Sequence, residues 1–101
     1  MVFDIIEAAI RSGSRKGGTG ARTPITAKQI VIEIQSAQQT DTVDQIVSGG
    51  RSARVYGEAL SPILLGRWLT KHLVGAVFDG KRLMKRTIHN QGHFSIEEVK
   101  R

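Results

Sequence analysis

The sequence predicts a small α+β fold in which several helices come first and a β-hairpin follows. Two observations carry the prediction. Before Leu73, apolar residues recur every three to four positions, which is the spacing of an amphipathic helix. Beyond Leu73 the pattern becomes strand-like, and Asp79-Gly80 and Asn90-Gln91-Gly92 are typical of turns between paired strands. The 101 residues suffice for one domain with one modest core.

Residues 2–12 predict the first helix, because their apolar residues follow helical spacing. Asp4 and Glu7 suit the N-terminal turns of this helix and Arg11 suits its last turn, given the helix dipole. The apolar residues are Val2, Phe3, Ile5, Ile6, Ala8, Ala9 and Ile10.

The segment from Ser12 to Pro24 reads SGSRKGGTGARTP and predicts a flexible loop, because it holds four glycines. It is basic and contains no acid, so we expect an arm that lies along DNA. The chain is therefore divided into residues 1–24, a helix with a basic glycine-rich arm, and residues 25–101, the compact domain. The basic residues of the arm are Arg15, Lys16 and Arg22.

Two further helices are predicted in the first half of the compact domain. Thr26 is the expected N-cap of a helix that runs to about Ala37. Asp41 or Thr42 is the expected cap of a short second helix, which the glycines at 49–50 end. The apolar residues of the two helices are Ile30, Val31, Ile34, Val43, Ile46 and Val47.

Ser61-Pro62 is the clearest helix start in the chain, with an N-cap serine and a proline at the first helical position. We expect this helix to run to about Leu73, whereas residues 51–60 before it fit either a loop or a further helical turn. Its apolar side is expected to hold Leu64, Leu65, Trp68, Leu69 and Leu73, and its other side Gly66, Arg67, Thr70 and Lys71.

The C-terminal part reads as strands and turns. A short strand at 77–78 and a turn at 79–80 lead into a strand at 82–89. A turn at 90–92 then leads into a strand at 93–99. The order of three helices and a hairpin is that of a winged helix-turn-helix domain, with helix 2–12 as an extra N-terminal element.

The charge of the chain points to a polyanionic partner. Fifteen Lys and Arg face nine Asp and Glu, which gives a net charge of +6. Residues 61–93 hold six bases and one acid, so six minus one, or +5, belongs to the last helix and the hairpin. Because each neutralised phosphate releases counterions, we expect binding to double-stranded DNA that weakens steeply with salt.

The last helix and the hairpin supply the candidate DNA contacts. Residues near the start of a recognition helix reach base edges, and the fork of Arg67 matches the two acceptors of guanine. Gly66 beside it suggests that a partner backbone comes close. The candidates on the helix are Ser61, Arg67, Thr70 and Lys71, and those on the hairpin are Lys81, Arg82, Lys85 and Arg86 for phosphates, with His89, Asn90 and Gln91 for further hydrogen bonds.

Other functional classes lack their signatures. Without cysteine there is no disulfide or thiolate metal site, and three histidines alone do not complete a zinc site. The glycines at 17–20 precede Ala21-Arg22 and lack the order of a phosphate-binding loop. No nucleophile stands beside a base, so we expect no enzyme and no cofactor. No apolar run is long enough for a membrane, and we expect a cytoplasmic or nucleoid-associated protein.

The stretch from Ile25 to Val99 resembles the winged-helix modules of phage and plasmid replication proteins, often found at the C-terminal end of primase-helicase chains. The resemblance lies in TAKQI (26–30), SPILLGRWLTKHL (61–73) and RLMKRTIHNQGHFSI (82–96), where Leu65-Gly66 and Leu69 match the spacing of the family's helix. It implies a winged helix, but no ATPase or primase chemistry. The long polar segment before Ser61 departs from the tightest helix-turn-helix.

These observations predict a DNA-binding protein that acts in replication, transcription regulation or partition of a mobile element. Two alternatives stay open. A winged helix also serves as a protein-interaction module, and helix 2–12 could dock on a partner or on a second copy of the chain. RNA binding is the other alternative, and it would normally need exposed aromatic residues for base stacking.

Overall fold

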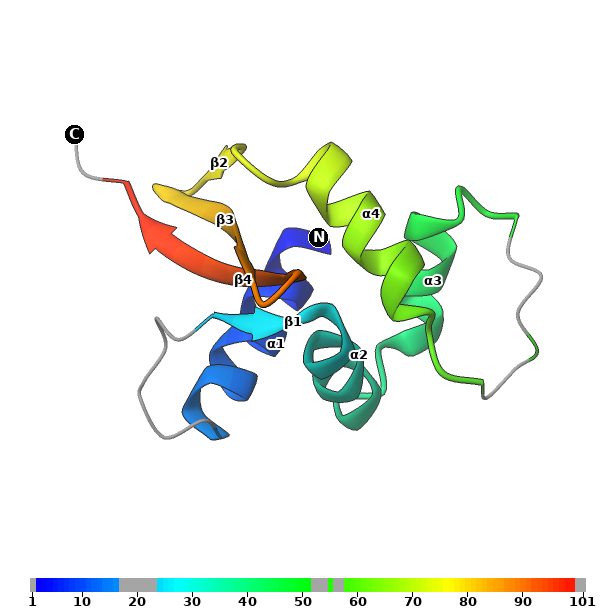
Figure 1. Cartoon of the computed structure of the whole chain (residues 1–101). Coiled ribbons are helices and arrows are strands. Elements are labelled where there is room, and N and C mark those ends of the chain that lie inside the picture. The colour runs from blue at the N-terminus through cyan, green and yellow to red at the C-terminus, as the bar shows by residue number, and fades with distance from the viewer. Residues whose placement is uncertain (1, 17–23, 52–54, 56–57, 100–101) are drawn as a thin grey trace.

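The computed structural model describes residues 2–16, 24–51, 55 and 58–99. Within these residues the chain forms a small α+β domain with four helices and one four-stranded antiparallel sheet. Along the chain, a helix is the first element and the long hairpin is the last. Helix α1 (Val2–Lys16) runs behind the sheet, and α2 (Ala27–Ser36), α3 (Thr40–Val47) and α4 (Pro62–His72) lie to its side (Figure 1).

Helix α1 extends further than predicted and belongs to the core. Its backbone stays helical to Lys16, so the expected loop does not begin at Ser12. Gly13 and Ser14 are buried, and this packing holds the last turn in place despite its weak helix formers. The apolar side of α1 joins the same core as residues 25–99, so this helix packs with the compact domain from which the sequence analysis divided it. Its buried residues are Phe3, Ile6, Ala9 and Ile10.

The predicted N-cap of α2 is confirmed, whereas that of α3 is wrong. The Thr26 hydroxyl accepts a hydrogen bond from the Gln29 amide at 3.2 Å. Helix α3 begins at Thr40, with Gln39 in the cap position and no side-chain cap bond, so Asp41 and Thr42 both lie inside the helix. It ends as predicted at Gly49 and Gly50, whose φ angles of 66° and 81° favour glycine.

Helix α4 has the predicted start. The Ser61 hydroxyl accepts a hydrogen bond from the Leu64 amide at 3.4 Å, and Pro62 follows. Its buried side is narrower than predicted, because Leu65, Leu69 and Leu73 are buried while Leu64 is 55% exposed. Leu64 lies about 100° around the helix from Leu65, and this rotation turns it away from the core.

Gly66 is half-buried and lies beside the start of α2. A Cβ atom at this position would lie 3.6 Å from the Cβ atom of Ala27 at the start of α2. The glycine therefore sits beside a neighbouring helix of the same domain. This contact gives the glycine a packing role within the fold, and the expectation that a partner backbone comes close to it stays a prediction.

The sheet has the strand order β1-β4-β3-β2. Strands β3 (Lys81–Ile88) and β4 (Gln91–Glu98) form the long hairpin, and β2 (Val77–Phe78) pairs with β3 across the predicted Asp79-Gly80 turn. Strand β1 (Ile25–Thr26) pairs with β4 and was not predicted, because a strand of two residues shows no alternation.

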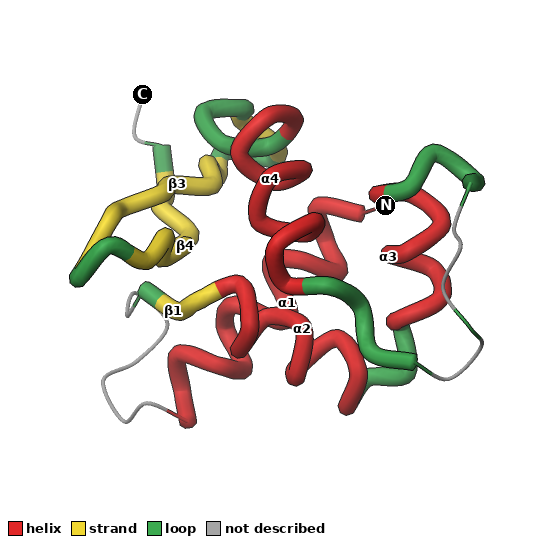
Figure 2. Tube along the Cα trace, turned by 45° about the vertical axis from the view of Figure 1, so that its right-hand side comes forward, coloured by secondary structure: helices red, strands yellow, loops and turns green. Residues whose placement is uncertain are grey.

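The turn of the long hairpin lies earlier than predicted. Ile88 pairs with Gln91, which leaves His89 and Asn90 as the turn, with φ angles of 50° and 63°. Both residues adopt the left-handed conformation of a two-residue hairpin turn. Gly92 belongs to β4 opposite Thr87. The hairpin extends away from the helices, and its turn forms a projecting end of the molecule (Figure 2).

The core lies between the sheet and helices α1, α2 and α4. Helix α3 adds only Val43 to the fully buried apolar residues, so α3, and not the N-terminal helix, is the peripheral element. The rings of Phe3 and Phe78 lie 4.6 Å apart and attach β2 to α1. The buried residues that the sheet and the two later helices contribute are Ile25, Ile30, Val31, Ile34, Leu65, Leu69, Leu83, Phe94 and Ile96.

Candidate nucleic-acid interface

The basic residues of β3 divide between the two faces of the sheet. Successive side chains of a strand point to opposite faces, and Leu83 is buried on the side of the helices. Lys81 and Lys85 share that face, whereas Arg82 and Arg86 lie on the other. The four predicted phosphate contacts are therefore not a single patch.

Two of these four cations are paired within the fold. Lys81 Nζ lies 3.0 Å from Glu7 Oε2, and Arg82 donates a hydrogen bond of 2.8 Å to Glu97. Burial raises the pKa of Glu7, but hydrogen bonds and charges from Lys81 and Arg11 outweigh it and hold this pKa below its ordinary value. The end of the hairpin far from its turn is thus largely neutralised.

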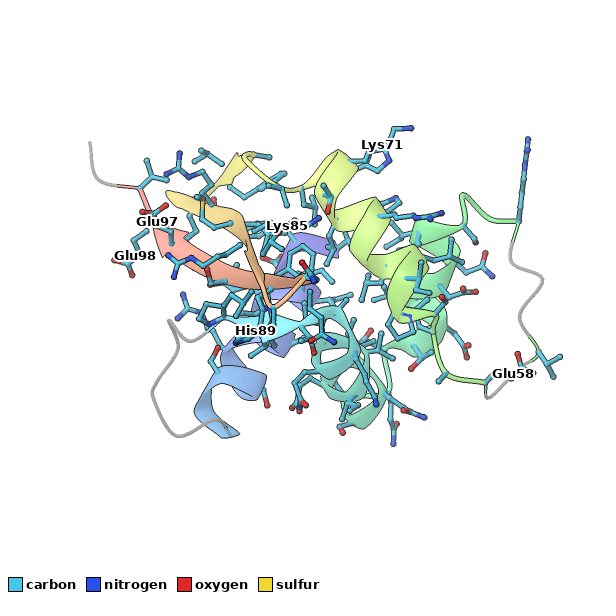
Figure 3. The ribbon with its side chains drawn as sticks, viewed as in Figure 1. Glu58, Lys71, Lys85, His89, Glu97 and Glu98 are labelled. Carbon is cyan, nitrogen blue, oxygen red and sulfur yellow. The ribbon has the colours of Figure 1, made fainter. Side chains whose placement is uncertain are left out.

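The turn end of the hairpin is different. Lys85 and Arg86 are exposed, and no carboxylate of the described residues forms an ion pair with either. Residues 84–96 contain no acid. In Figure 3, His89 lies at the turn and Glu97 and Glu98 lie at the opposite end of the strands. Positive charge is therefore concentrated on the projecting half of the hairpin.

Lys85 leans toward the turn. It pairs with Phe94 in the sheet, but a Cβ atom on Gly92 would lie 3.0 Å from its Cε atom. Its side chain therefore crosses diagonally over Gly92, two residues nearer the turn. A glycine at 92 leaves the space for this path, which carries the ammonium group toward the projecting end.

The histidines of the hairpin do not face each other. His93 pairs in register with Arg86, and His89 lies in the turn. His93 Nδ1 lies 3.0 Å from the Gln91 carbonyl oxygen. No group of three or more potential metal-binding side chains occurs among the residues that the structure describes. Asn90 and Gln91 are exposed at the turn.

The outer face of α4 carries the other predicted contacts. Arg67 and Lys71 are exposed, lie one turn apart and have no ion pair with the described acids. Thr70 donates a hydrogen bond of 2.8 Å to the Gly66 carbonyl oxygen, and the Ser61 hydroxyl caps the helix. Lys71 points away from the hairpin in Figure 3, so α4 and the hairpin present two separate groups of cations.

The outer face of α4 also exposes two large apolar residues, Ile63 and Leu64, that were not among the predicted contacts. Their side chains are 69% and 55% exposed in the first turn of α4. The sequence pattern assigned Ile63 to neither side of the helix and placed Leu64 on the apolar side with Leu65 and Leu69.

The predicted basic arm is only partly covered by the structure. Arg15 and Lys16 belong to the last turn of α1 by their backbone, and basic residues there suit the helix dipole. Their side chains and the whole of Arg22 lie outside the described residues. The prediction that these residues lie along DNA stays a prediction.

The apolar side of α1, which was the docking site in the alternative of a protein-interaction module, is buried in its own domain. An open groove remains between α1 and α2, lined by apolar and acidic residues such as Ile5, Ala37 and Asp4. None of the described helices combines the length and the apolar character that a membrane crossing requires.

Comparison of the chain with models of protein families, with curated proteins and with solved structures finds no match. The geometry and charge of the chain therefore carry the functional argument.

Proposed function

We propose that this chain is a double-stranded DNA-binding module with a winged-helix fold. In this assignment α1, α2 and α4 are the three helices of the fold, α4 is the recognition helix, and the β3–β4 hairpin is the wing. The pairing of β1 with β4 beside β3 supports this organisation, because it ties the wing to the helices. Helix α3 is then an insertion between the second helix and the recognition helix.

The observation that carries the proposal is the distribution of unpaired cations. Arg67 and Lys71 on α4, and Lys85 and Arg86 near the hairpin turn, are exposed without an acidic partner among the described residues. Because cations that neutralise phosphates release the counterions condensed on DNA, such groups supply affinity for DNA. In contrast, Lys81 and Arg82 already pair with carboxylates and contribute less.

Two other functions have less support. Base stacking on single-stranded RNA needs exposed aromatic rings. Of the aromatic residues described, Phe3 and Phe94 are buried and Trp68 and Phe78 are half-buried. Docking of a partner on the apolar side of α1 conflicts with its burial. The sequence resemblance favours a role in replication, transcription regulation or partition of a mobile element.

The test is a fluorescence-anisotropy titration of a labelled random-sequence duplex at two salt concentrations. The Lys85→Ala/Arg86→Ala variant is compared with Arg11→Ala/Arg82→Ala, which removes the same charge from two ion pairs. If both hairpin cations contact phosphates, the first variant loses affinity and its salt slope becomes shallower by about two units. The control variant, Arg11→Ala/Arg82→Ala, should keep most of the salt slope of the unmodified chain.

Two outcomes would contradict the proposal in different ways. Equal losses in the two double variants would assign the effect to net charge and remove the hairpin from the interface. No binding of the unmodified chain at low salt would reject DNA binding altogether.

A further inference from the structure

The first turn of α4 exposes two large apolar side chains at a place where the fold does not use them. Ile63 is 69% and Leu64 is 55% exposed, while Leu65 next to them is fully buried. Large apolar groups on the surface are ordinary when they are single. Here two adjacent ones stand at the start of the helix that we assign to DNA recognition.

Helix α4, which carries this apolar pair, is basic. No acidic residue occurs from Ala59 to Phe78, and Arg67 follows Ile63 one turn later on the exposed face of α4. The N-terminus of the helix adds a partial positive charge at the same end. An apolar surface on a protein partner would remove water from Arg67 without supplying a counter-charge. The occupant must therefore be anionic overall and yet present apolar groups.

The major groove of DNA has this combination. Its walls are phosphates, and each thymine places a C5 methyl group on its floor, where apolar side chains make contact. The N-terminal residues of a recognition helix are those that approach base edges. Resting on the proposed function, we infer that Ile63 and Leu64 contact thymine methyl groups in the major groove and give the protein a preference for A·T pairs.

The inference is tested with two duplexes that differ only in methyl groups. One is a 24-base-pair alternating d(AT) duplex, and the other is its d(AU) counterpart, which keeps all hydrogen-bonding groups of the bases. The unmodified chain should bind d(AT) about four-fold more tightly for each methyl group contacted, because burying one such group contributes about 0.8 kcal/mol. Contact with a methyl group is not electrostatic. The ratio of the affinities for d(AT) and d(AU) should therefore persist when salt weakens both complexes.

The Ile63→Ala/Leu64→Ala variant should lose this ratio by binding d(AT) as weakly as d(AU), with its affinity for d(AU) nearly unchanged. Val77→Ala is the matched control, because Val77 is also exposed, at 53%, but lies on β2. It should keep the preference. The Ile63/Leu64 pair and Val77 are all on the surface. Circular dichroism checks that the variants remain folded.

Equal affinity of the unmodified chain for d(AT) and d(AU) would overturn the inference and leave DNA binding intact. A double variant that loses d(AT) and d(AU) binding equally would also overturn it, because the apolar pair would then not read methyl groups. No binding to either duplex at low salt would instead reject the proposed function itself.

Discussion

Lys81 Nζ lies 3.0 Å from Glu7 Oε2, and this ion pair joins the start of β3 to the first helix. The two residues are 74 positions apart in the sequence. Arg11 donates a second hydrogen bond, of 2.9 Å, to the same carboxylate. The pair has a structural consequence and a functional one, since it stabilises the fold and removes Lys81 from the cations available to a ligand.

Replacing Glu7 by glutamine should lower the free energy of unfolding by on the order of 1 kcal/mol at pH 7. The pKa of Glu7 is lower in the folded chain than its ordinary value of 4.5. Its stabilisation is therefore fully present above the unfolded-state pKa and is lost as the pH falls through the folded-state pKa. Urea unfolding at pH 7 and at pH 3 should show the difference between Glu7→Gln and the unmodified chain shrinking at the lower pH.

Glu97→Gln is the control for Glu7→Gln. Its partner Arg82 and Glu97 itself are 38% and 51% exposed, and ion pairs on the surface contribute little. If the difference in free energy of unfolding between Glu7→Gln and the unmodified chain stayed constant with pH, this would contradict a charge-dependent role of the Glu7 carboxylate.

Gly13 and Gly66 should respond to alanine in opposite directions. In a helix, alanine is favoured over glycine by about 1 kcal/mol. At Gly13 the added Cβ atom would lie 2.6 Å from the Cδ1 atom of buried Ile25, and overpacking of this kind costs roughly 1–3 kcal/mol. At Gly66 the nearest side-chain atom is an ordinary 3.6 Å away.

Thermal unfolding should therefore show Gly13→Ala less stable and Gly66→Ala more stable than the unmodified chain. Gly66→Ala should also keep its affinity for DNA, because the added Cβ atom would lie beside α2. A large loss of affinity in a stable Gly66→Ala variant would place this residue at the interface and contradict its assignment to packing inside the fold.

Ser61 can be tested separately as a helix cap and as a DNA contact. Ser61→Ala removes the cap and should destabilise the chain by about 1 kcal/mol. Ser61→Asp keeps a good cap but adds a negative charge at the start of α4. If this end of α4 enters the groove, Ser61→Asp should bind duplex DNA more weakly while its unfolding midpoint stays near that of the unmodified chain. Unchanged affinity would place the helix start away from the DNA.

The features that were predicted from sequence depend on neighbours in the chain. The cap at Thr26 and the Ser61-Pro62 start each use residues within one turn, and the Asp79-Gly80 turn is local as well. Alternation along β3 also implies that Lys85 and Arg86 lie on opposite faces, so the predicted phosphate contacts of the hairpin cannot form one patch.

The features that were missed depend on contacts between distant residues. The last turn of α1 is held by packing, and β1 exists because Ile25 pairs with Phe94. The turn at His89-Asn90 follows from a register in which Leu83 pairs with Ile96, both of them in the core. No local pattern shows that Glu7 neutralises Lys81. The sequence therefore shows which residues are basic. The fold decides which of them form ion pairs with carboxylates.

Arg67 should determine sequence preference more than overall affinity. Its guanidinium group can donate two hydrogen bonds to guanine O6 and N7. A good bidentate pair of this kind discriminates against a wrong base by about 1–3 kcal/mol. Lys71, one turn later, is a point charge suited to a phosphate, so its loss should weaken all duplexes alike and reduce the salt slope by about one. A preferred duplex is first selected from a random pool, and Arg67→Ala and Lys71→Ala are then titrated with it and with the unselected pool. Arg67→Ala should narrow the ratio of the two affinities, whereas Lys71→Ala should leave the ratio and lower both. Equal losses on both duplexes in Arg67→Ala would mean that this arginine contacts the backbone, and that bases are read elsewhere on the protein.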